Sequence, residues 1–155
     1  VASVGNDYHG KMGSPGSSPL ALSVGGAWRP EGWPLEVADF SGGASLVFPG
    51  PRPTSVTKPD VVAPGRYVYS CIPRRKDGAA GLVPNYARKE GTSMAAPHVA
   101  GVVALLMAAK PLATAERIIE VVKETADHPT GYRPDNRWGY GMLNPRAALA
   151  MLSND

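Results

Sequence analysis

The sequence predicts an α/β fold in which a parallel sheet packs against a central buried helix. Two segments carry this prediction. Residues 20–27 (LALSVGGA) contain little polar surface, which is typical of a parallel strand that helices cover on both faces. Residues 94–109 are free of charge apart from one histidine, which favours a helix inside the protein. The 18 glycines and 16 prolines among 155 residues indicate many turns between such elements.

Composition and charge exclude several classes of protein. The length suits one domain with a real core, and 43% apolar and 19% charged residues are ordinary for a globular protein. No apolar run reaches the roughly 20 residues that a membrane span needs. The net charge of +3 is scattered, and the basic clusters 74–76 and 88–89 are interpreted as a solvated loop. We therefore expect neither a membrane span nor nucleic-acid binding.

Shorter elements follow from local patterns. The run 1–4 is β-prone and stops at turn residues, 60–62 is a short buried strand, and 67–71 is a strand by alternation, whereas 72–90 is expected to be a long polar loop. Two helices carry start signals: Thr114 suits the N-cap of 115–125, and Asn144 followed by Pro145 suits the start of a last short helix. The single cysteine, Cys71, cannot form an internal disulfide.

The start of the central helix has the features of a nucleophile site. Gly91 and Thr92 form a tight turn that presents Ser93 at the first helical turn. The unpaired N–H groups and partial positive charge of a helix start favour developing negative charge. A serine there suits acyl transfer. Pro97 cannot donate to the Ser93 carbonyl, so a bend is expected in this turn.

The octet GTSMAAPH at 91–98 resembles the serine motif of the subtilases, the subtilisin-like serine proteases. Three other segments are similar to subtilase segments, namely GN at 5–6, PDVVAPG at 59–65 and GYGMLN at 139–144. The resemblance runs from Val4 to Leu149. It implies a subtilisin-like parallel-sheet fold, C-terminal half only, with residues 1–155 forming the C-terminal part of a peptidase domain. It also implies a serine endopeptidase that acts through an acyl-enzyme on Ser93.

The resemblance implies further site residues. Asn6 looks like the subtilase asparagine whose amide forms the oxyanion hole together with the Ser93 N–H, a role that suits a neutral, directional donor. Gly13 matches the floor of the pocket for the side chain that precedes the cut, and small residues form one wall: Ala2, Ser3, Val4 and Gly5. Asp60 matches a structural position, so we expect it to accept hydrogen bonds from nearby N–H groups rather than to serve as the triad acid.

The general base that Ser93 needs is missing from the expected positions. His98 matches a structural histidine of the family, His128 is expected to be exposed, and His9 does not continue into the His-Gly-Thr helix that carries the subtilase base. In subtilases the triad Asp and His precede the oxyanion asparagine. The chain therefore looks like a C-terminal half whose partner is the N-terminal half of the same domain, and we expect the isolated chain to be inactive.

Other interpretations remain open. A substituted histidine upstream would make the chain a pseudoprotease half or a non-catalytic fragment that acts in assembly or peptide binding. A phosphate loop at 5–11 has suitable glycine and lysine spacing, but Met12 stands where Ser or Thr is needed. The resemblance implies a protein or peptide substrate and secretion rather than a cytoplasmic location. It implies no required cofactor; calcium would serve stability only, and the sequence identifies no ligands for it and no other metal site. Residues 88–90 depart from the family before Gly91, which affects substrate preference.

Overall fold

The computed structural model describes residues 1–73 and 85–154. Its centre is a small sheet in which β1 (Ala2–Ser3) and β6 (Val61–Pro64) lie parallel to β2 (Ser23–Trp28) on either side. A short β3 (Glu36–Val37) pairs antiparallel with the end of β2. The parallel sheet expected from the apolar segment 20–27 is therefore confirmed, with β2 as its middle strand and Val24 fully buried.

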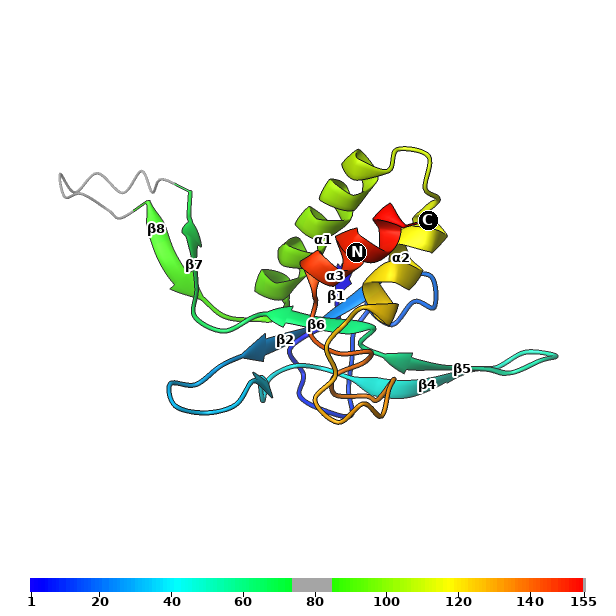
Figure 1. Cartoon of the computed structure of the whole chain (residues 1–155). Coiled ribbons are helices and arrows are strands. Elements are labelled where there is room, and N and C mark those ends of the chain that lie inside the picture. Colours follow the sequence, from blue (N-terminus) through cyan, green and yellow to red (C-terminus); the bar gives the residue numbers. More distant parts are fainter. Residues whose placement is uncertain (74–84, 155) are drawn as a thin grey trace.

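Three helices lie together on one side of this sheet (Figure 1): α1 (Thr92–Ala109), α2 (Ala115–Glu124) and α3 (Pro145–Ser153). Their start signals act as predicted, because the Thr114 hydroxyl accepts from the Arg117 N–H at 3.2 Å and the Asn144 side chain accepts from the Ala147 N–H at 3.0 Å. The core between helices and sheet is aliphatic and includes Leu22, Val24, Val61, Val99, Leu106, Ile118, Val122 and Leu152.

The prediction of a buried central helix is correct for one side of α1 only. Its buried residues are Thr92, Ala95, Val99 and Leu106, which face β2, β6 and the other helices, whereas 70% of Leu105 and 51% of Met107 are exposed. The reason is that the described residues place no layer against the other side of α1. By length and composition alone α1 could cross a membrane, but its contacts are those of a helix in a globular core.

Two hairpins extend from the sheet region (Figure 1). One joins β4 (Ala44–Phe48) and β5 (Thr54–Lys58), and the sequence patterns did not predict it. The other joins β7 (Val68–Cys71) and β8 (Tyr86–Lys89), so the prediction that all of 72–90 is loop is wrong for 86–89. Charged and polar side chains on both faces of β8 hide its alternation. The basic cluster at 74–76 lies outside the described residues.

Candidate active site

Ser93 lies in the first turn of α1, where glycine shapes the backbone. Gly91 has a φ of +140°, a value that side chains rarely adopt. Its N–H donates to the Gly65 carbonyl at 2.8 Å, and its own carbonyl accepts from the Met94 N–H at 3.0 Å. A Cβ added at Gly91 would come within 3.0 Å of Asn6 Nδ2. Glycine therefore gives both the turn and the space that bring Asn6 against the helix start.

Asn6 and Thr92 are joined by two hydrogen bonds although 86 positions separate them in the sequence. Asn6 Oδ1 accepts from the Thr92 N–H and from the Thr92 hydroxyl, each at 2.9 Å. The Thr92 hydroxyl in turn accepts from the Gly5 N–H at 3.2 Å, and Thr92 is 1% exposed. Asn6 thus caps one of the unpaired N–H groups of α1 from a distant segment. The Asn6 side-chain oxygen is held in place by these bonds.

Two donors beside Ser93 stay unused. Because Oδ1 of Asn6 is occupied, its Nδ2 is the remaining donor, and neither this group nor the Ser93 N–H donates to any of the residues that the structure describes. Ser93 and Asn6 are both exposed. Neutral donors next to a serine at a helix start can stabilise an oxyanion that forms on an attacked carbonyl.

Thr92 is a positioning residue that the sequence reasoning missed. The sequence pattern indicates only a small hydroxyl residue in the turn, whereas in the structure its buried hydroxyl links Asn6 to Gly5 and so ties the end of the β1 segment to α1. The available signal was a hydroxyl residue directly before Ser93 and after a glycine. A hydroxyl both donates and accepts, which is what a bridge between an amide oxygen and a backbone N–H requires.

The residues predicted to bind substrate lie together at β1. The Gly13 N–H donates to the Val4 carbonyl at 3.1 Å. A Cβ at Gly16 would be 2.4 Å from the Ser3 carbonyl oxygen, so glycine allows the turn after Gly13 to approach the strand. Val4 is buried, and Ala2, Ser3, Gly5 and Gly13 are half-buried. This geometry assembles the predicted wall and floor next to Asn6, and their role in substrate binding stays a prediction.

None of the three histidines forms a hydrogen bond with Ser93 among the residues described. His98 is exposed and its Nδ1 lies 2.9 Å from the Met94 carbonyl of its own helix, as expected for a structural residue. His9 is exposed. The expected exposure of His128 is wrong: its side chain is 1% exposed, its Nδ1 accepts from the Thr130 N–H at 3.3 Å, and its Nε2 lies 3.2 Å from Asp135. This tertiary pocket left no periodic signal in the sequence.

Asp60 accepts structural hydrogen bonds, as its sequence position indicated. Its Oδ2 accepts from the Ser23 N–H at 2.7 Å, the Ser23 hydroxyl at 2.9 Å and Lys58 Nζ at 2.6 Å, while Lys123 Nζ lies 2.9 Å from Oδ1. Burial raises the pKa of the Asp60 carboxyl, but the bonds from Lys58, Ser23 and Lys123 outweigh burial and hold this pKa below its usual value. All of these bonds join core elements, so this carboxylate has a structural role.

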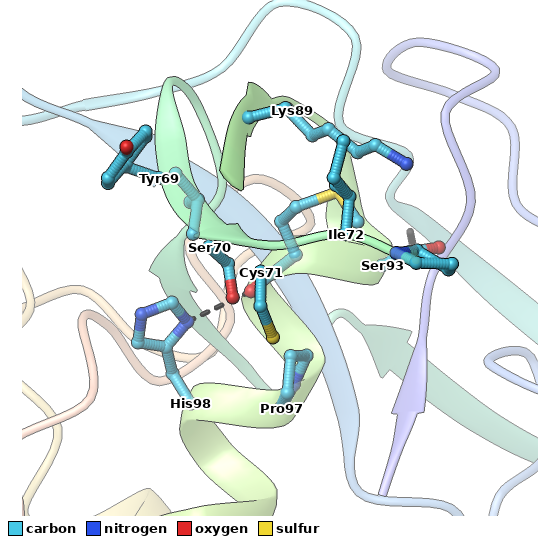
Figure 2. Close-up of a pocket in the computed structure, with 12 residues that line it drawn as sticks. Tyr69, Ser70, Cys71, Ile72, Lys89, Ser93, Pro97 and His98 are labelled. Carbon is cyan, nitrogen blue, oxygen red and sulfur yellow. Dashed lines mark hydrogen bonds between the residues drawn. The ribbon is translucent and has the colours of Figure 1, made fainter. Parts of the chain in front are cut away.

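A hollow of about 430 Å³ lies between the β7–β8 hairpin and the first turns of α1. Ser93 stands at one end of it and His98 at the other, with Cys71 and Pro97 between them (Figure 2). Met94, which directly follows Ser93, also lines the hollow and is half-buried. A peptide side chain would fit in a space of this size next to Ser93.

The described residues hold no group of three or more His, Cys, Asp or Glu side chains that could bind a metal ion. Calcium prefers six to eight oxygen ligands, with carboxylates prominent among them. No residue is therefore assigned to calcium.

Several known proteases are similar to this chain in sequence. The chain is 38% identical over 126 residues to the minor extracellular protease Vpr of Bacillus subtilis, covering 76% of the chain and 14% of that protein. It is 34% identical over 149 residues to the M-protease of Shouchella clausii, covering 96% of the chain and 32% of that protein. It thus spans a third or less of the length of these relatives.

Solved structures are similar as well. Fervidolysin from Fervidobacterium pennivorans, a keratinolytic enzyme related to subtilisin, has a TM-score of 0.72 and 28% identity over 96% of this chain and 22% of its own. The CspB protease of Clostridium perfringens has the same score and identity over 95% and 30%. The α/β fold is consistent with the C-terminal half of such a domain. Because a profile of the subtilase family matches residues 1–141, the chain belongs to the subtilase family.

Proposed function

We propose that this chain supplies the nucleophile and the oxyanion hole of a serine endopeptidase. Ser93 Oγ attacks the carbonyl carbon of a peptide bond as its proton passes to a base; the C–N bond then breaks, the amine leaves with that proton, and an acyl-enzyme remains. Water hydrolyses the acyl-enzyme, which releases the acid and restores the Ser93 hydroxyl. The Asn6 amide and the Ser93 N–H stabilise the negative charge on the carbonyl oxygen. The observation that carries the proposal is the pair of bonds from Thr92 to Asn6 Oδ1, which leaves Nδ2 as a free donor beside Ser93.

The base and its orienting carboxylate come from outside this chain. His98 is engaged with its own helix, and His128 is buried against Asp135. Neither of them, nor the exposed His9, forms a hydrogen bond with Ser93 among the described residues, and a serine hydroxyl is a poor nucleophile at neutral pH without a base. We propose that the N-terminal half of the same catalytic domain supplies both groups and covers the exposed side of α1, where Leu105 and Met107 lie.

Substrate and location follow from the same proposal. The substrate is a protein or peptide whose side chain before the cut lies against Ala2–Gly5 and Gly13. Because Ala2, Ser3 and Gly5 are small, they leave room for that side chain. The relatives named as extracellular proteases favour secretion for this protein too. Calcium stays a possible stabiliser, with no cofactor required for the chemistry.

The test compares the assembled enzyme with its Ser93→Ala variant. We expect peptide hydrolysis to fall by at least about 10³-fold, and an organophosphonate probe to label Ser93 in the parent only. Ser153→Ala is the matched control, because the Ser153 hydroxyl is exposed and donates to the Leu149 carbonyl within α3. This control should keep the parental rate.

Two further results decide between the enzyme and a non-catalytic half. The isolated 155-residue chain should neither hydrolyse peptides nor react with the probe, because it lacks the base. If an assembled enzyme that contains an upstream histidine were equally active with and without Ser93, the nucleophile assignment would be wrong. A pseudoprotease would show peptide binding or assembly with no Ser93-dependent turnover under any condition.

A further inference from the structure

The hollow beside Ser93 carries a single fixed charge among its described lining residues, that of Lys89. Most of the other lining side chains are apolar or small, and His98 has its Nδ1 at the Met94 carbonyl. In Figure 2 the Lys89 side chain runs from β8 along the edge of the hollow toward the end where Ser93 lies. A peptide side chain that entered this hollow would therefore meet an ammonium group.

Lys89 is available for such a contact. No carboxylate of the described residues forms an ion pair with its Nζ. The nearest acidic residue in the sequence, Glu90, instead accepts from Arg66 Nε at 3.1 Å. The Arg66 guanidinium also lies over the rings of Trp28 and Phe40, which hold it in place. The Lys89 charge is thus left for a ligand.

Strand geometry separates Lys89 from its basic neighbour. Side chains alternate between the two faces of a strand, and Ala87 and Lys89 line the hollow while Arg88 does not. On β7 their partners in register, Ser70 and Val68, line the hollow, and so do Tyr69 and Cys71. Arg88 carries the same charge one position away and does not line the hollow, which makes it a matched control.

From the proposed placement of the acyl side of the substrate we infer that the hollow lies on the leaving-group side of the cleaved bond. The residues proposed to hold the acyl side of the substrate, Ala2–Gly5 and Gly13, do not line it, whereas Ser93 does. A peptide bound with its scissile carbonyl at Ser93 has its acyl side along β1. The residues after the cut then continue past Ser93 toward the β7–β8 hairpin.

We propose that Lys89 selects an acidic side chain in the first two positions after the cleaved bond. The inference rests on the proposed function and names its substrate preference. A carboxylate in the hollow would pair with the Lys89 ammonium against an apolar background. Lys89 is exposed, so water and salt screen the attraction and the preference is modest.

The experiment measures kcat/KM of the assembled enzyme on matched peptides that carry Glu or Gln after the cut. In the parent the Glu peptide should be the better substrate, and Lys89→Gln should lower the Glu-to-Gln ratio by about twofold to fivefold. Raising the salt concentration should lower the parental ratio toward that of the variant. Arg88→Gln removes the same charge from the other face and should leave the ratio near the parental value.

The outcomes separate the two proposals. Ser93-dependent hydrolysis with a ratio that Lys89→Gln leaves unchanged, or that Arg88→Gln lowers equally, would overturn the role of Lys89 while the protease assignment stands. An absence of any Ser93-dependent hydrolysis would overturn the proposed function and this inference with it. Lys89→Glu sharpens the test, because it should favour a Lys peptide over a Glu peptide.

Discussion

Two polar clusters join distant segments of this protein, and they differ in how fully their groups are paired. Around Asp60, both carboxylate oxygens have a lysine partner. The Lys58 side chain is 1% exposed, and its ammonium also donates to the Ala21 carbonyl at 2.7 Å. At the start of α1, Asn6 uses its oxygen but not its amide nitrogen within the described residues, and Ser93 is exposed. Buried polar groups must be paired for stability, whereas an exposed donor that its neighbours hold in place stays available to a ligand.

Both clusters also hold the fold together, because each one joins segments that are far apart in the sequence. Asp60 joins the turn before β6 to β2 through Ser23 and to α2 through Lys123. Asn6 joins the end of the β1 segment to α1 through Thr92. A change in the first cluster should therefore alter stability alone, and a suitable change in the second should alter catalysis alone.

The largest effect is expected for Asn6→Asp in the assembled enzyme. Aspartate keeps the acceptor for the Thr92 N–H but replaces the free donor with a negative charge beside the oxyanion. We expect kcat to fall by about 10²–10³-fold, about 2.7–4 kcal/mol, while the midpoint of thermal unfolding changes little. If the variant had a lower midpoint of thermal unfolding and the parental kcat, the role of Asn6 would be that of a helix cap alone.

Next is Lys58→Met, which removes a buried charge and keeps a long side chain. We expect the free energy of unfolding to fall by about 3 kcal/mol, because Asp60 stays buried with fewer partners. Urea unfolding of the assembled enzyme measures this change. Adding Asp60→Asn should restore part of the loss, since no uncompensated buried carboxylate remains. Unchanged stability in Lys58→Met would show that Lys123 and Ser23 suffice for Asp60.

A smaller effect is expected from oxidation of Met94. Its thioether lines the hollow next to Ser93, and a sulfoxide oxygen there would disturb the tetrahedral intermediate. We expect peroxide to lower kcat of the assembled enzyme by about tenfold, about 1.4 kcal/mol, with circular dichroism unchanged. Met94→Ala should resist peroxide at some cost in initial rate. Equal inactivation of parent and variant would place the sensitive group elsewhere.

The smallest effect near neutral pH is expected from the titration of Asp60. Its pKa in the folded protein lies below the usual value for aspartate, because Lys58, Ser23 and Lys123 bond to the carboxylate, so the unfolded chain binds the proton more readily. The stability from this difference is complete above the unfolded pKa and is lost as pH falls through the folded pKa. Unfolding midpoints should fall in this acid range in the parent and fall less in Asp60→Asn. Identical acid dependence would assign the loss to other carboxylates.

The patterns that predicted elements well are local ones. The start of α2 at Thr114 and of α3 at Asn144 and Pro145 follow from side chains that bond to backbone groups three residues away. Apolar continuity likewise marked β2. The β4–β5 hairpin and strand β8 were not predicted because their sequences carry no clean alternation of apolar and polar residues: the burial of β4 alternates, but apolar Val47 stands at an exposed position, and β8 has polar side chains on both faces.

By itself, the sequence determined the α/β class, the position of Ser93 at a helix start and the resemblance of its octet to the subtilase motif, because these depend on short-range spacing. Only the tertiary structure decided which end of Asn6 is free, that Thr92 bridges Asn6 to Gly5, that His128 is buried and that Lys89 faces the Ser93 hollow. Each of these depends on segments far apart in the chain that meet only when the sheet and α1 pack. Side-chain partners across such distances leave no periodic signal in one sequence.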